Sequence, residues 1–289
     1  IRDFLDRNTW LTDRDWIFWK LQQALYLLEE DMPASCRHQI QLSELVARGE
    51  VPMRPTQAYR EINRGSLVAI YSGNQDASAK LLLSLSQFTP RNHFQAKLYA
   101  DLKLRRTIEM GFFLLNGNFA EAAAGEILES QITIEGDLHA LYLYYSATSL
   151  LYAGNTDLGH RVIRAFFQIP KAQRGMISYQ MDYLEIYYFI AKKDYETANV
   201  LIDRKKRRKC TVFQRLILNT ARAIIDANGR ISPALLEKIE PEQRALANTA
   251  DRREVLLFDL DNLIHALNGT LTTSMLQPDD QKPYLKMVI

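Results

Sequence analysis

Tyrosine is concentrated in one part of the chain. Nine of the 14 tyrosines lie between Tyr142 and Tyr195, most of them in two segments with helical periodicity. A tyrosine side chain combines a large, fairly rigid ring with one hydroxyl, so it suits recognition of another molecule better than bond-making chemistry. This concentration of rings is therefore either a binding surface or ordinary core filling with the hydroxyls at its edge.

A run of six consecutive cations is the second feature that could do chemistry. Such a run binds the phosphates of nucleic acid, or it is the solvated end of a helix, where cations complement the negative pole of the dipole. The preceding Asp203 and a formal net charge of only +2 favour the helix end, and no aromatic residue interrupts the run to stack on bases. The run consists of Arg204, Lys205, Lys206, Arg207, Arg208 and Lys209.

Patterns for catalysis or metal binding are weak. The run from Val255 to Asn262 imitates the motif that delivers a nucleophilic aspartate in haloacid-dehalogenase-like phosphatases. Only 28 residues follow Asp261, and the leucines of the run fit a helix better, so we interpret it as coincidence. The five histidines lack metal-ligand spacing, and no glycine-rich phosphate loop occurs. The sequence predicts no catalytic site, no metal site and no cofactor.

Composition indicates a protein with an ordinary core. Hydrophobic residues make up 47% and charged residues 24% of the chain, and no apolar run approaches the roughly 20 residues of a membrane helix. The two cysteines, Cys36 and Cys210, lie far apart, which fits reduced thiols better than a disulfide framework. We predict a cytoplasmic protein without a membrane partner.

The elements that would position the tyrosines and the cations are marked by a recurring turn. Apolar helical runs end near Gly73, Gly117, Gly154, Lys193 and Gly229, in steps of 44, 37, 39 and 36 residues. Each of these residues is expected to take a positive φ, and a second apolar helix follows each one. Periods of this length are typical of solenoids, because one helix pair cannot bury its own apolar face.

Hydrophobic periodicity predicts the individual helices. Leu138, Leu141, Tyr142 and Tyr145 follow the i, i+3, i+4, i+7 spacing of one buried helical face, and no alternating strand pattern exceeds four residues. Residues 1–55 are predicted as an N-terminal helical cap, 56–240 as helical repeats, and 241–289 as a capping helix and tail. The expected helices are 15–30, 37–48, 57–72, 75–88, 92–116, 119–130, 137–153, 156–169, 177–192, 195–208, 211–228, 233–239 and 242–268, the last either continuous or broken near Asn248-Thr249.

The repeat resembles the tetratricopeptide repeat, a helix pair of roughly 34 residues with a Gly-Asn/Asp-aromatic turn, a small residue after it and a terminal proline. Residues 57–240 carry the resemblance, which implies a right-handed superhelical solenoid of antiparallel helix pairs. The spacing is longer throughout, and Lys193 replaces one turn glycine. In its longer period the chain is similar to the helical sensor regions of bacterial MalT-like regulators. The matching residues are Gly73-Asn74 with Pro90, Gly117-Asn118-Phe119 with Ala122, Gly154-Asn155 with Gly159 and Pro170, and Asp194-Tyr195 with Ala198.

In tetratricopeptide-like stacks the first helix of each pair lines the concave face. The resemblance therefore implies a groove on the first helices of two adjacent repeats. Because this groove lacks the Lys and Arg that grip a free carboxylate, we expect a helical or extended segment with apolar anchors as its partner. The predicted groove residues are Tyr144, Thr148, Tyr152, Gln180, Tyr183 and Tyr187.

Together these observations predict a non-enzymatic scaffold or a regulatory sensing domain that binds a protein segment, peptide or small ligand on its concave face. The alternative is a nucleic-acid-associated transcription regulator that uses residues 204–209. An enzyme with a site between repeats is the third hypothesis, and it lacks a recognisable catalytic set.

Overall fold

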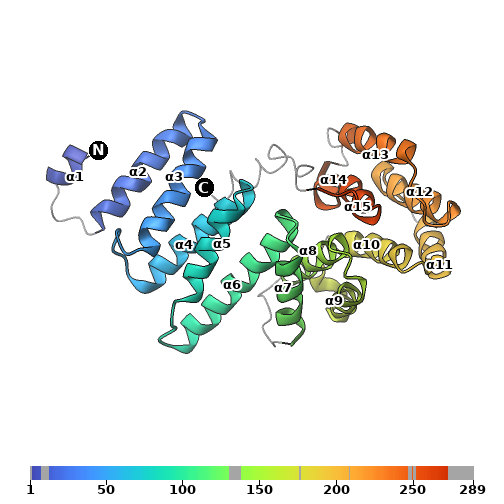
Figure 1. The fold of residues 1–289 in the computed structure, drawn as a ribbon, viewed down its shortest axis with the longest axis horizontal. Helices are drawn as coiled ribbons and strands as arrows, with labels where there is room; N and C mark the ends of the chain where they lie inside the picture. The colour runs from blue at the N-terminus through green and yellow to red at the C-terminus, as the bar shows by residue number, and fades with distance from the viewer. Residues whose placement is uncertain are drawn as a thin grey trace. The chain divides into compact units, whose positions relative to one another are not determined.

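The computed structural model describes residues 2–7, 13–129, 138–175, 177–207, 209–246, 249 and 252–272. Helices hold 80% of these described residues, and no strand occurs among them, so the predicted all-α fold class is confirmed. The chain divides into two compact units, of which the first runs to Leu114 and the second begins at Leu115. Figure 1 shows the helices of each unit in chain order.

Successive helices of the first unit pack on one another, and the fourth contacts the third, fifth and sixth. Leu42, Ile62 and Leu104 are fully buried in its core. The third and fourth helices approach closely at Gly65, where a Cβ atom would lie only 2.2 Å from the Ser43 hydroxyl oxygen. The helices are α1 (Arg2–Arg7), α2 (Arg14–Leu28), α3 (Met32–Ala47), α4 (Pro55–Tyr71), α5 (Gln75–Ser86) and α6 (His93–Phe113).

The second unit contains a row of helices in which α10 contacts both α8 and α12. We call α8, α10 and α12 the first helices, because α9, α11 and α13 follow them as the second members of helix pairs. The bounds are α7 (Gly117–Glu129), α8 (Leu138–Tyr152), α9 (Thr156–Gln168), a 3₁₀ turn (Lys171–Gln173), α10 (Ile177–Ala191), α11 (Tyr195–Lys206), α12 (Val212–Asp226), α13 (Pro233–Leu246), α14 (Arg252–Leu257) and α15 (Leu260–Leu267). Within the described ranges, no helix combines the length and apolar character needed to cross a membrane.

One turn geometry recurs between paired helices. The second residue after the earlier helix of the pair takes a left-handed φ of 72° at Gly73, 74° at Gly154 and 60° at Lys193, and its N–H bonds back to the last turn of that helix. The next side chain caps the following helix by accepting a hydrogen bond from the backbone N–H three residues on. The capping residues are Asn74, Asn155 and Asp194. The predicted turns at these three positions are confirmed.

The same turn also occurs between α2 and α3, inside the segment predicted as a cap. Glu30 has a φ of 57°, its N–H bonds to the carbonyl of Leu27, and Asp31 accepts a hydrogen bond from the N–H of Ala34. The sequence gives no signal for this turn, because glutamate is not a residue type that indicates a positive φ.

Several expectations about helix ends are wrong, among them the start of α3, which lies at Met32 and not at residue 37. Gly117 is the first residue of α7, and Leu115, with a φ of 51°, is the left-handed residue of that turn. The helix predicted over 242–268 is also absent as one element, because α13 continues through Pro241 and the later residues form α14 and α15. The two short helices are separated at Asp259, whose side chain accepts a hydrogen bond from the N–H of Asn262 and so begins α15.

Candidate partner-binding site

The six predicted groove residues lie on α8 and α10, which pack against each other. Tyr152 is half-buried, and the other five are buried. Tyr144 is 1% exposed and Tyr187 is fully buried. In the structure these side chains therefore come from two neighbouring helices, and five of the six are buried and do not line an open groove.

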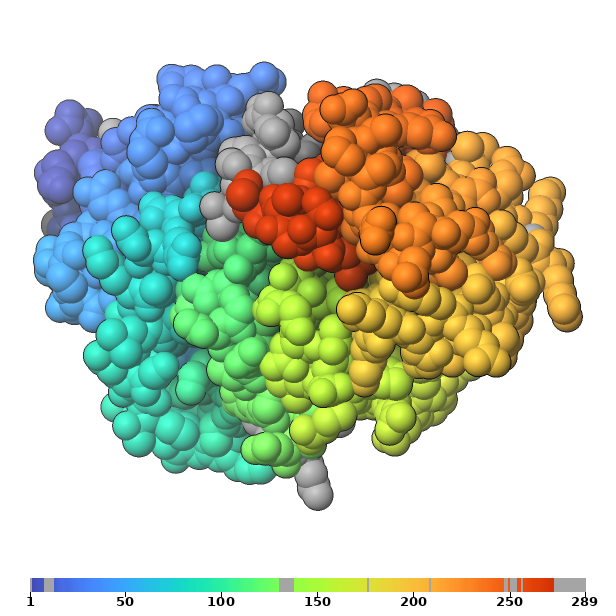
Figure 2. Space-filling view, turned by 45° about the vertical axis from the view of Figure 1, so that its right-hand side comes forward, coloured from blue at the N-terminus to red at the C-terminus, as the bar shows by residue number. Residues whose placement is uncertain are grey.

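A segment from much further along the chain covers these tyrosines. It comprises residues 252–267, which are α14, Phe258, Asp259 and α15, and we call it the covering segment. The Tyr144 hydroxyl donates a hydrogen bond of 2.6 Å to the backbone oxygen of Leu257, 113 residues away in sequence. α15 packs on α8 and on α13. Figure 2 shows the red atoms of α15 lying directly on the body of the second unit, beside the orange atoms of α13.

Phe258 is the apolar anchor of the covering segment. Its side chain is 2% exposed. Its ring centroid lies 6.4 Å from that of Tyr183, with the rings nearly perpendicular at 81°, and 6.2 Å from that of Tyr187. Aromatic pairs at such separations attract one another beyond the burial of their area. Phe258 therefore lies against Tyr183 and Tyr187, where an apolar anchor residue of a partner was expected.

Glu254 attaches the covering segment to the beginning of α12. Its carboxylate accepts hydrogen bonds from the Thr211 hydroxyl at 2.8 Å and from the Gln214 side-chain amide at 2.7 Å. Thr211 and Gln214 also form the capping box of α12. A carboxylate at this end is favourable because the helix dipole is positive there.

Gln243 of α13 holds the bend between α14 and α15. Its amide nitrogen donates to Asp259 Oδ1 at 2.9 Å, and its oxygen accepts from the N–H groups of Leu260 and Asp261 at 2.8 and 3.1 Å. These bonds satisfy backbone donors at the first turn of α15 that lack partners inside the helix.

Besides Tyr144, two more of the predicted groove residues use their hydroxyls inside the unit. The Tyr187 hydroxyl donates to the backbone oxygen of Ile217 on α12 at 2.9 Å, and the Thr148 hydroxyl donates to the backbone oxygen of Tyr144. Burial raises the pKa of Tyr187 well above its ordinary value. Tyr187 therefore joins α10 to α12 as a neutral hydrogen-bond donor and does not offer its hydroxyl to a partner.

Asp261 is a carboxylate placed unfavourably within the covering segment. Burial raises its pKa from 3.8 to about 6, and the charge of nearby Asp259 adds to the increase. The other charged or titratable groups around it are His265 on α15, Glu240 and Arg244 on α13, and Tyr152 on α8. His265 Nε2 lies 3.8 Å from Asp261 Oδ1 and only partly offsets the effect.

We expect Asp261→Asn to stabilise the second unit at neutral and alkaline pH. A folded-state pKa above the unfolded one means that the ionised carboxylate weakens the fold above about pH 6, and that this penalty disappears as pH falls towards 4. The variant should raise the free energy of unfolding by about 1–3 kcal/mol at pH 8 and by nothing measurable at pH 4. Urea unfolding followed by circular dichroism at both pH values tests this, with Glu237→Gln on the exposed surface of α13 as the control. An equal gain at both pH values would contradict the assignment.

The basic run does not form the continuous patch that the sequence suggested. Lys205 is 9% exposed and is ion-paired with Asp182 of α10. It shares one face of α11 with Ala198 and Ile202, which are fully buried, at i, i+4 and i+7 spacing. Arg208 lies outside the described residues. The cations that the structure leaves exposed are Arg204, Lys206, Arg207 and Lys209.

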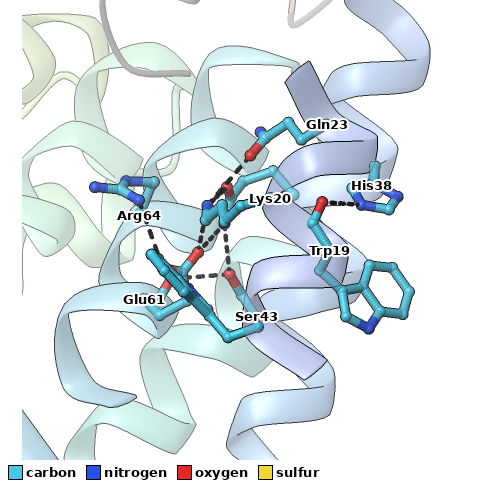
Figure 3. Close-up of polar contacts among 9 residues, drawn as sticks. Trp19, Lys20, Gln23, His38, Ser43, Glu61 and Arg64 are labelled. Atoms are coloured by element: carbon cyan, nitrogen blue, oxygen red, sulfur yellow. Dashed lines mark hydrogen bonds and ion pairs between the residues drawn. The ribbon is translucent and has the colours of Figure 1, made fainter. Parts of the chain in front are cut away.

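A second polar cluster, which the sequence analysis did not predict, joins α2, α3 and α4 of the first unit (Figure 3). Lys20 Nζ lies 2.8 Å from Glu61 Oε1 and 2.6 Å from the Gln39 side-chain oxygen, and Trp16 Nε1 donates to Glu61 Oε2 at 3.2 Å. Burial alone would raise the pKa of Glu61, but the charge of Lys20, with hydrogen bonds from Lys20 and Gln39, lowers it overall. The paired charges link three helices.

No metal or phosphatase-like site emerges from the part of the chain that the structure describes. No three His, Cys, Asp or Glu side chains in those residues are placed to hold a metal ion. The phosphatase-like run belongs to α14 and α15, so no strand presents Asp259.

A scan against protein-family models, a search of curated proteins and a search of solved structures each found no match to this chain. A function must therefore be inferred from the chain's own contacts.

Proposed function

We propose that this chain is a non-enzymatic binding protein whose second unit recognises a helix-containing protein segment on the surface of its first helices. The observation that carries the proposal is the covering segment itself. It is held by a buried aromatic anchor at Phe258, a hydrogen bond to a backbone oxygen at Leu257, and a carboxylate at a helix start at Glu254. Contacts of these kinds are the means by which helical surfaces bind helical peptides.

We further propose that the helix pairs stack as a right-handed, tetratricopeptide-like solenoid. The order of contacts supports this arrangement, because α8 packs on α9 and α10, and α10 packs on α11 and α12. The turn after α4, α8 and α10, with one left-handed residue followed by a capping side chain, gives further support. In such stacks each pair buries its apolar face against its neighbours, and the first helices form an extended binding surface.

The nucleic-acid alternative has weaker support. Lys205 is ion-paired within the fold, and Asp203, next to the run, lies 2.5 Å from Arg222 as a second ion pair. Arg204, Lys206, Arg207 and Lys209 stay exposed, but the pairing of Lys205 and the carboxylate of Asp203 reduce the cationic surface that phosphate binding needs. We therefore rank a protein partner above a nucleic acid.

Selection of a helical-peptide display library on the full chain tests the proposal. We expect enriched peptides to share one aromatic residue and to bind Tyr144→Phe about threefold to tenfold more weakly, because the variant loses one hydrogen-bond donor to the backbone of the bound segment. Tyr179→Phe is the matched control, since Tyr179 lies on α10 with 52% of its surface exposed. Peptides that bind Tyr144→Phe and wild type equally would place the recognition surface elsewhere.

A further inference from the structure

We infer that the covering segment is an internal ligand of the proposed recognition surface, and that a partner segment of the same pattern displaces it. The inference rests on the proposed function and specifies both the partner and its regulation. The pattern is a carboxylate four residues before an aromatic residue, followed at once by an acidic helix cap and a leucine. In this chain those positions are Glu254, Phe258, Asp259 and Leu260.

Residues of the second unit bind or contact each position of the pattern. The carboxylate is bound by Thr211 and Gln214, and the aromatic ring contacts the rings of Tyr183 and Tyr187. The cap and the amide of the following leucine are bound by Gln243 of α13. A segment from another protein with these groups at these spacings would satisfy the same donors, acceptors and aromatic faces.

Loss of the covering segment leaves few buried polar groups without partners. Thr211 Oγ1 still accepts from the N–H of Gln214, and Gln214 Oε1 still accepts from the N–H of Thr211. Their donor hydrogens, that of the Tyr144 hydroxyl and the side-chain amide of Gln243 lose the partners that the segment supplies, and water or an incoming segment replaces them. The main loss is apolar contact, that of Phe258 with the tyrosines and that of the buried Leu260, Leu263 and Ile264 of α15, and a partner segment with apolar residues at these positions restores it.

The covering segment also contains a feature that weakens its own attachment. Asp261 lies half-buried on α15 near a second carboxylate, Asp259, and partial burial together with this like charge raises its pKa, so the ionised form is disfavoured there. A partner segment with a neutral residue at that position would therefore bind the surface more tightly than the chain's own segment does at neutral pH.

Binding of a fluorescein-labelled synthetic peptide of residues 250–269 to the full chain tests the inference by fluorescence anisotropy. Against wild type we expect weak binding, because the internal segment competes. Phe258→Ala in the chain should lower the dissociation constant at least tenfold, and Asp261→Asn should raise it at pH 8. Leu138→Ala, at an exposed site of α8, is the control and should leave it unchanged. A peptide that itself carries Phe258→Ala should not bind.

The outcomes separate the inference from the proposed function. If the peptide binds wild type and Phe258→Ala with equal affinity, the surface recognises such a segment but the internal one does not compete, which overturns the inference alone. If the peptide binds neither chain while Phe258→Ala keeps its helical circular dichroism, both are overturned. Should Phe258→Ala not fold, Glu254→Ala replaces it, with an expected twofold to fivefold tightening, and an unchanged dissociation constant overturns the inference.

Discussion

Replacing Glu61 by alanine should lower the free energy of unfolding of the first unit by about 3–5 kcal/mol, because it leaves a mostly buried charge without its partner. Lys20, whose side chain is 20% exposed, loses the carboxylate 2.8 Å away. Trp16 Nε1 loses its acceptor, and the Gln39 amide loses one of its two acceptors. The three tryptophans of the chain all precede residue 20. Urea unfolding followed by tryptophan fluorescence therefore reports on this unit selectively.

Two controls distinguish the buried pair from ordinary surface electrostatics. Glu50→Ala removes an ion pair with Arg48 that is 2.6 Å long but more than half exposed, and it should cost well under about 1 kcal/mol. Lys20→Met combined with Glu61→Leu should restore most of the stability, because no lone charge is left in the interior. If Glu61→Ala is as mild as Glu50→Ala, the cluster does not stabilise the unit.

The pH dependence of the Glu61 effect has a definite sign. Because the pKa of Glu61 is lowered in the folded state, its contribution is present above the ordinary carboxylate value and is lost as the pH falls through the folded-state value. The difference between wild type and Glu61→Ala should therefore be constant from pH 6 to 8 and shrink below pH 4. A difference that grows on acidification would contradict the pairing.

The helices and most turns could be predicted because their signals are local. Gly73 and Gly154 have the residue type that a left-handed turn favours, and Asn74 and Asn155 are good caps, so a few neighbouring residues determine each turn. Glu30 gives no such signal, since its conformation is set by the hydrogen bonds of the turn around it.

Whether the candidate site is covered or open could not be predicted, because this depends on contacts between residues far apart in sequence. Periodicity correctly assigns Tyr144 and Tyr187 to first helices, but it cannot tell whether a partner or the same chain covers that face. The hydrogen bond from Tyr144 to Leu257 spans 113 residues, and no local pattern encodes it. For Lys205 a signal did exist, because it follows Ala198 and Ile202 on the apolar face of α11.

The same dependence on distant contacts makes Gly159 a sensitive position in the second unit. Gly159 lies on α9, and a Cβ atom there would be 1.8 Å from the Tyr188 hydroxyl oxygen and 2.4 Å from its Cζ. Tyr188 on α10 is 1% exposed, and its hydroxyl donates to the backbone oxygen of Ala147 on α8. Because Gly159 has no side chain, Tyr188 of α10 can pass close to α9 and reach its hydrogen-bond acceptor on α8.

Gly159→Ala should therefore lower the free energy of unfolding of the second unit by about 2–4 kcal/mol, since the buried Tyr188 ring cannot move aside without breaking its hydrogen bond. Gly125→Ala on α7 is the matched control, because nothing lies within 4 Å of a Cβ atom there, and it should gain about 0.5–1 kcal/mol from helix propensity alone. Urea unfolding monitored by far-ultraviolet circular dichroism measures both. Tyr188→Phe removes the nearest clashing atom, so the double variant with Gly159→Ala should be less destabilised than the sum of the two single variants by at least about 0.5 kcal/mol. If the two changes in the free energy of unfolding are strictly additive, the alanine at position 159 does not contact Tyr188. Other residues would then have to stabilise the packing of α8, α9 and α10.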